Sequence, residues 1–131
     1  MARSFGPASL GTLLVVEDDA GSASSFKILL ESLGYQVQVA EDAASALAVL
    51  TSTDVDAVLC DLKLPGKMSG LDLAAVIRGD PDLQELPLVA VTGYGHPDDR
   101  ELTNTAGFDA HLVKPVDLPE LETVLRQLAE K

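Results

Sequence analysis

The sequence predicts an α/β fold in which a doubly wound parallel sheet is covered by helices on both faces. Two observations carry this prediction. Five short apolar runs, each of the length of a buried strand, alternate with five stretches in which apolar residues recur at helical spacing. The connections between them are short, and strict strand–helix alternation calls for parallel strands joined by crossover helices.

The first two strand–helix units occupy the first 50 or so residues. Residues 13–16 are apolar and are followed by acidic residues, which predicts a strand that is buried on both faces. The helix after it is expected to stop at Gly34. Residues 35–39 alternate in polarity and predict the second strand, and Asp42 is expected to cap the second helix.

The middle of the chain carries the third and fourth units. Residues 55–60 predict a strand that ends at Asp61, and a loop rich in proline and glycine separates it from the third helix. Residues 88–91 predict the fourth strand, which ends at Thr92. The fourth helix is expected over residues 97–106, with acidic residues in its first turn and a glycine at its end.

The last unit begins with a predicted strand over Ala110–Val113, which ends at Lys114. Asp117 and Glu120 have the spacing of a capping box and predict the start of a final helix. The apolar residues that follow recur at helical spacing, which completes the fifth unit.

Composition limits the range of functions. The 131 residues, 47% of them hydrophobic, suffice for one core, so we expect a flexible tail over residues 1–11 and one domain over residues 12–131. The net charge of −12 disfavours binding to nucleic acid or to an anionic membrane and suits a divalent cation or a basic partner. The N-terminal apolar stretch is too short for a signal peptide or a membrane span, so we expect a cytoplasmic protein. Cys60 lies in an apolar run and is expected to be an inert core residue.

Polar side chains follow four of the predicted strands. They are Glu17, Asp18, Asp61, Thr92 and Lys114. The carboxyl ends of parallel strands meet at one edge of the sheet, which is where ligands bind in open α/β folds. Two carboxylates about 4 Å apart repel by about 4 kcal/mol at an effective dielectric constant of 20. Either one of them takes up a proton or a hard dication such as Mg²⁺ binds them, and the carbonyl of Lys63 could add another oxygen ligand.

This set of residues suits phosphoryl transfer. A carboxylate such as that of Asp61 can form an aspartyl phosphate, and a bound cation would neutralise the transferring oxygens. The Lys114 ammonium and the Thr92 hydroxyl could stabilise the charge on the same phosphoryl group. Taken singly, each residue has a structural alternative: Thr92 could bond backbone, Lys114 could be a surface charge and Asp61 could cap a turn.

The chain resembles the response-regulator receiver domain of two-component signalling systems over residues 12–128. The resemblance rests on four segments in the family's order, LLVVEDD, AVLCDLKLPG, VAVTGYG and LVKP. It implies a flavodoxin-like (βα)5 fold with strand order 2-1-3-4-5. It also implies a phosphoacceptor that receives its phosphoryl group from a histidine kinase or a phosphotransfer protein, and not an enzyme, apart from reactions on its own phosphoryl group.

The resemblance also assigns roles to residues. Asp61 would be the phosphoacceptor, and Asp18, Asp61 and the backbone carbonyl of Lys63 would ligate Mg²⁺ or Mn²⁺, with Glu17 helping through a water. Thr92 would move towards the phosphoryl group, and Lys114 would pair with it. A cis peptide bond is implied between Lys114 and Pro115.

Three departures from the family pattern concern the output surface. His111 stands where the family often has a tyrosine or phenylalanine that swings inward, and Val116 replaces a common phenylalanine. The PGKMSG loop is one residue longer than the commonest form, which is similar to receivers attached to hybrid histidine kinases. The surface around Thr92, His111 and Lys114 is the expected contact with a downstream protein.

Other function classes give different expectations. An aspartyl-phosphate phosphatase usually has a second aspartate two residues after the nucleophile, where this chain has Lys63. A flavin-binding protein of the same architecture would need a hydroxyl-rich phosphate loop after the first strand, which is absent from the sequence. A pseudo-receiver, which keeps the fold as a binding module without phosphorylation, would not need the complete set of acidic residues.

Overall fold

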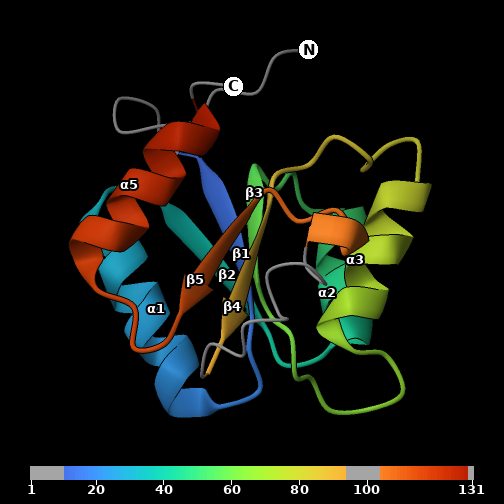
Figure 1. Ribbon diagram of the computed structural model, residues 1–131, viewed down its shortest axis with the longest axis horizontal. Coiled ribbons are helices and arrows are strands. Elements are labelled where there is room, and N and C mark those ends of the chain that lie inside the picture. The colour runs from blue at the N-terminus through green and yellow to red at the C-terminus, as the bar shows by residue number, and fades with distance from the viewer. Residues whose placement is uncertain (1–10, 94–103, 130–131) are drawn as a thin grey trace.

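The computed structural model describes residues 11–93 and 104–129. Within these residues, strands and helices alternate as the sequence predicts (Figure 1). The strands are β1 Thr12–Val16, β2 Gln36–Ala40, β3 Ala57–Asp61, β4 Leu88–Thr92 and β5 Ala110–Val113. The helices are α1 Ala20–Ser32, α2 Ala43–Ser52, α3 Gly70–Gly79 and α5 Leu118–Ala129.

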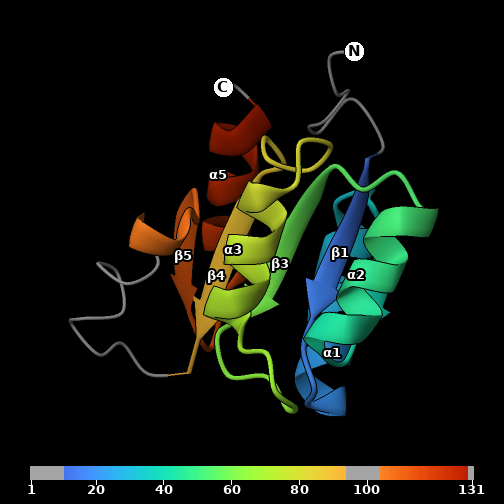
Figure 2. The same ribbon diagram turned by 90° about the vertical axis from the view of Figure 1, so that its right-hand side faces the viewer.

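All five strands form one parallel sheet of order β2-β1-β3-β4-β5. Helices α1 and α5 cover one face, and α2 and α3 cover the other (Figures 1 and 2). The predicted doubly wound fold and its strand order 2-1-3-4-5 are therefore confirmed. The reversal of direction in the strand order lies between β1 and β3, which is where an open α/β sheet forms its ligand-binding crevice.

The core consists of two apolar layers, one on each face of the sheet. Successive residues of a strand point to opposite faces, so Leu14 and Val16 of β1 pack in the layer with α2 and α3. Leu13 and Val15 pack in the layer with α1 and α5. Cys60 is buried in the first layer, as expected for a core thiol. Burial on both faces explains why β1, β3 and β4 are almost continuously apolar until the edge that carries the polar residues, whereas the edge strand β2 alternates in polarity.

The predicted helix signals are confirmed wherever the structure describes them. The Asp42 carboxylate accepts a hydrogen bond from the Ser45 amide at 2.7 Å and caps α2. Asp117 likewise accepts from the Glu120 amide at 2.8 Å at the start of α5. Gly34 follows α1 with a φ of 102°, a left-handed conformation that glycine adopts without strain.

Strand boundaries differ from the predictions by one or two residues. The second strand begins at Gln36 because the Tyr35 amide still donates to the carbonyl of Leu30 at the end of α1. The third strand begins at Ala57 and includes Asp61, which pairs with Val91 of β4. Apolar character alone placed these limits, whereas the hydrogen bonds to neighbouring strands and helices decide them.

Several predictions fall on residues outside the described ranges. These are the tail over residues 1–10 and the start of the fourth helix, over residues 97–103. Residues 104–106 are helical, and Gly107 follows them with a φ of 100°, as expected for a helix end. Among the described helices, none is long and apolar enough to cross a membrane.

Candidate functional site: an acidic cluster at the carboxyl edge of the sheet

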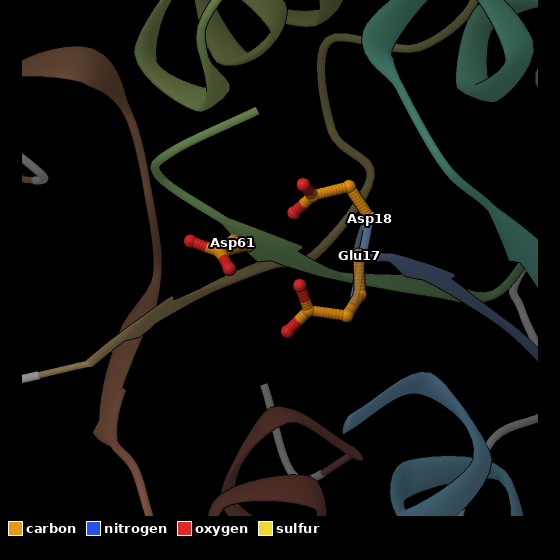
Figure 3. A group of neighbouring side chains, drawn as sticks. All are labelled: Glu17, Asp18 and Asp61. Carbon is orange, nitrogen blue, oxygen red and sulfur yellow. The ribbon is translucent and has the colours of Figure 1, made fainter. Parts of the chain in front are cut away.

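Three carboxylates converge at the carboxyl edge of the sheet. Glu17, Asp18 and Asp61 each offer an oxygen, and these oxygens all lie within 4.8 Å of one another. Glu17 and Asp18 directly follow β1, and their carboxylate groups are both turned to the side on which Asp61 ends β3 (Figure 3). The expected convergence of acidic side chains from separate strands is therefore observed.

The register of the sheet produces this convergence. Val16 of β1 pairs with Cys60 of β3. Glu17 and Asp61 each come directly after these paired residues, so they lie at the same height along the two neighbouring strands. The Glu17 amide continues the strand by donating to the Ala40 carbonyl at 2.9 Å. Because β1 and β3 are neighbours at the switch in strand order, the two acids project into the crevice that this topology creates.

Lys114 brings the counter-charge from β5. Its Nζ lies 3.2 Å from Asp61 Oδ2 and also forms an ion pair with Glu17 Oε1. The other Asp61 oxygen, Oδ1, accepts a hydrogen bond from the Lys63 amide at 2.9 Å. The Asp61 carboxylate is thus held at both oxygens, which fixes its orientation. The peptide bond between Lys114 and Pro115 is cis, as the resemblance implied.

Burial differs among the three acids and is greatest at Glu17. Glu17 is only 3% exposed, and this burial raises its pKa. Hydrogen bonds from Lys114 and from the Asp19 amide lower the pKa, and the negative charge of Asp61 raises it, so that the pKa stays above its usual value. Burial lowers the pKa of Lys114, but its bonds to Glu17 and Asp61 outweigh that effect and leave it raised. One ammonium faces three carboxylates, so the cluster retains negative charge that a dication would neutralise.

Gly70 packs directly against the backbone of Asp61 and Leu62, a contact that was not predicted from the sequence. A Cβ atom at this position would lie 2.4 Å from the Asp61 carbonyl oxygen and 2.8 Å from the Leu62 Cα. The Gly70 amide donates to the Leu62 carbonyl at 3.0 Å, so α3 begins in contact with the backbone of the phosphoacceptor candidate. A capping box between Ser69 and Asp72 fixes this start. The S-x-x-D spacing was the sequence signal for it.

Thr92 lies at the same edge but is turned elsewhere. It is 4% exposed, and its Oγ1 lies 3.1 Å from Nε2 of His111. Within the described part of the chain, the Thr92 hydroxyl forms no hydrogen bond with Asp61. The structure therefore joins the three acids and Lys114 directly and holds Thr92 beside them. Of the two histidines, His96 lies outside the described residues.

Cys60 directly precedes Asp61 in β3, and its environment makes its thiol unreactive. Burial raises the pKa of the thiol to about 12, and the charges of Asp61 and Glu17 act in the same direction. Since the thiolate is the reactive form of cysteine, Cys60 offers no competing chemistry near neutral pH.

A groove lies beside the acidic cluster, between α1 and the segment after β5. Its volume is 720 Å³, and Lys114 forms part of its wall. The groove is lined mainly by small polar and apolar side chains: Ser22, Ser25, Phe26, Leu29, Pro115 and Val116.

Comparisons with known proteins agree on one family. The family model of the response regulator receiver domain matches residues 13–126. The polar-differentiation response regulator DivK of Brucella ovis is 28% identical over 120 residues, which cover 91% of this chain and 97% of that protein.

Solved structures of similar proteins include receiver domains of histidine kinases. The receiver domain of a signal transduction histidine kinase from Syntrophus aciditrophicus is 29% identical with a TM-score of 0.83, covering 92% of this chain and 90% of that one. The receiver domain of the sensor histidine kinase PA1611 from Pseudomonas aeruginosa is 28% identical with a TM-score of 0.85, covering 94% and 100%. That structure holds a magnesium ion coordinated in its active site cleft.

Proposed function

Because the chain belongs to the response regulator receiver domain family of two-component systems, we propose that Asp61 is its phosphoacceptor. A histidine kinase or a phosphotransfer protein would supply the phosphoryl group. The observation that carries this proposal is the cluster at the sheet edge, where Asp61 lies with Glu17, Asp18 and Lys114. Glu17 shares these neighbours, but its side chain is only 3% exposed, against 13% for Asp61, so Asp61 is the more accessible of the two acids that Lys114 contacts.

The reaction is a displacement at phosphorus. An Asp61 carboxylate oxygen forms a bond to the phosphorus atom while the bond from phosphorus to the donor's imidazole nitrogen breaks, and the imidazole takes up a proton as it leaves. Hydrogen bonding of Oδ1 to the Lys63 amide holds the carboxylate in one orientation. Catalysis in such a transfer comes mainly from positioning and electrostatics.

Lys114 would stabilise the charge of the transferred group. Its Nζ is 3.2 Å from Asp61 Oδ2, so it lies where a phosphoryl oxygen attached to that carboxylate would need a positive charge. Thr92 would contribute its hydroxyl after leaving His111. Lys63 stands two residues after Asp61, where an aspartyl-phosphate phosphatase would need an acid, so the residues favour a stable acceptor over a hydrolase.

The acidic cluster fits a divalent cation. Glu17, Asp18 and Asp61 offer hard oxygen ligands with excess negative charge, which Mg²⁺ or Mn²⁺ prefers. We propose that Asp18, Asp61 and the Lys63 carbonyl ligate the ion and that Glu17 acts through a water. The bound cation would supply neutralisation of the transferring oxygens.

The surfaces beside Asp61 suit two classes of protein partner. The groove along α1 would accept the kinase or phosphotransfer protein, because it leads to Lys114 and has apolar walls. The surface around Thr92, His111 and Lys114 would report phosphorylation to a downstream protein. The net charge of −12 argues against nucleic acid and anionic membranes as partners, and we propose a cytoplasmic location.

A phosphorylation assay tests the proposal. We expect incubation with Mg²⁺ and a small phosphodonor, or with a panel of phosphorylated histidine kinases, to add one phosphoryl group that hydroxylamine removes. Asp61→Asn should abolish the mass gain, and EDTA should prevent it. Asp54→Asn is the matched control, because Asp54 is exposed and lies before β3, away from the cluster. Equal labelling of wild type and Asp61→Asn would refute the proposal.

A further inference from the structure

The contact between Thr92 and His111 is a side-chain pair with a specific geometry. The Thr92 Oγ1 and the His111 Nε2 are 3.1 Å apart. Thr92 is 4% exposed, so its hydroxyl has little access to water as an alternative partner. A buried hydroxyl that is deprived of its hydrogen-bond partner incurs a desolvation penalty, and His111 therefore biases the orientation of this side chain.

The sheet places this pair on the face opposite to the phosphoacceptor. His111 pairs in register with Ala90, which packs in the layer with α2 and α3, and Thr92 follows Ala90 by two residues. Side chains two residues apart share a face of a strand. Asp61 follows Leu59 by two residues, and Leu59 packs in the layer with α1 and α5. In this rotamer the hydroxyl that bonds His111 therefore lies on the α2 and α3 side of the sheet edge, whereas Asp61 leaves β3 on the α1 and α5 side.

A side-chain rotation can redirect the hydroxyl while the β4 backbone keeps its hydrogen bonds to the neighbouring segments. The Lys114 amide donates to the Thr92 carbonyl at 2.7 Å, and the Leu62 amide donates to the Val91 carbonyl at 3.2 Å. The threonine χ1 torsion has three staggered positions. Turning the hydroxyl from one of these to another breaks its contact with His111.

We propose that His111 is a positioning residue that holds the Thr92 hydroxyl in a withdrawn rotamer, so that a phosphoryl group on Asp61 competes with His111 for this hydroxyl. The inference rests on the proposed function of Asp61. A ligand shifts such an equilibrium only by its different affinity for the two states. One hydrogen bond of ordinary strength to His111 should therefore lower the equilibrium constant for contact between the Thr92 hydroxyl and the phosphoryl group on the order of fivefold.

A double-mutant cycle with beryllofluoride, which mimics a phosphoryl group on a carboxylate, tests this competition. In the presence of Mg²⁺, His111→Phe should raise the beryllofluoride affinity on the order of fivefold when Thr92 is present. The same substitution should change nothing in a Thr92→Val background, which lacks the hydroxyl. His111 has further contacts, and the cycle cancels their effect because both backgrounds lose them.

Two conservative variants separate the hydrogen bond from the shape of the ring. A glutamine side chain can place its amide near the position of Nε2, so His111→Gln should keep the wild-type affinity. An asparagine side chain is too short, so His111→Asn should behave like His111→Phe. An equal change in affinity in both Thr92 backgrounds would overturn the proposal, because it would show that His111 acts by another route.

A measurement without phosphate keeps this inference distinct from the function of Asp61. Three-bond NMR couplings of Thr92 in the free protein should report one χ1 rotamer in the wild type and averaging in His111→Phe. An unchanged rotamer would overturn the proposal. If the wild type takes up neither beryllofluoride nor a phosphoryl group, the proposed function of Asp61 fails. The χ1 rotamer of Thr92 measured in the free protein would still show whether His111 positions this side chain.

Discussion

Replacing Lys114 by methionine should destabilise the protein strongly, but only while the acidic cluster lacks a cation. The Nζ lies 3.2 Å from Asp61 Oδ2, where the attraction is about 5 kcal/mol at an effective dielectric constant of 20. Removing one partner of a buried ion pair typically costs about 3–5 kcal/mol. The Lys114 and Asp61 side chains are 23% and 13% exposed, which moves the expected loss to the lower end, about 3 kcal/mol.

Urea unfolding with EDTA and with saturating Mg²⁺ measures this effect. A dication between the carboxylates supplies the charge that the ammonium supplied, and binding to the folded state adds stability by mass action. We therefore expect the deficit of Lys114→Met to shrink to less than about 1 kcal/mol when Mg²⁺ is present. Lys67→Met is the control, because Lys67 is exposed and, within the described residues, forms no ion pair. A deficit that is the same with EDTA and with Mg²⁺ would refute this reasoning.

Three further predictions concern the surroundings of the site. Burial raises the pKa of Glu17, so its carboxyl group binds a proton more tightly in the folded state than in the unfolded state. Without Mg²⁺, the free energy of unfolding should therefore fall as the pH rises from the Glu17 pKa of the unfolded state through the higher pKa of the folded state. Glu17→Gln should remove that fall in urea titrations at several pH values. Gly70→Ala should cost about 1–3 kcal/mol and slow phosphorylation, because its Cβ would press on the Asp61 carbonyl, whereas Gly79→Ala, with open space around it, should be neutral or stabilising. Arg78→Lys should lower the thermal midpoint almost as much as Arg78→Ala, because a lysine cannot replace the guanidinium bonds to three backbone carbonyls and a carboxylate. Full rescue by lysine would mean that charge alone matters there.

The sequence predicted the parts of this protein that depend on local pattern. Continuous apolar runs predict strands buried on both faces, and parallel strands must end at one edge, so the meeting of Glu17, Asp18 and Asp61 followed from their positions after predicted strands. Lys114 joined them for the same reason. The direct salt bridge to Glu17 was not expected, because burial of a side chain depends on packing that periodicity does not reveal.

The contacts that local pattern did not predict are those between distant segments. Gly70 ends the segment rich in proline and glycine that was expected to be a loop, and its approach to the Asp61 backbone depends on how α3 packs on the sheet. No contact was predicted for Arg78, whose side chain links α3 to Gly107 and Asp109 near β5. The contact between His111 and Thr92 depends on the register between β4 and β5. This register is a property of the paired strands and cannot be predicted from the pattern of either strand alone.

The sharing of Lys114 between two carboxylates suggests an order of events at the site. In the free protein its ammonium pairs with both Glu17 and Asp61. A phosphoryl group on Asp61 would carry roughly two negative charges and would draw the ammonium away from Glu17. Glu17 is 3% exposed, so its carboxylate would then be buried without a positive partner unless a cation is already bound or a proton is taken up. We therefore expect cation binding to precede and favour phosphorylation, and the phosphorylated protein to bind Mg²⁺ more tightly than the free protein does, since coupling between two ligands is reciprocal.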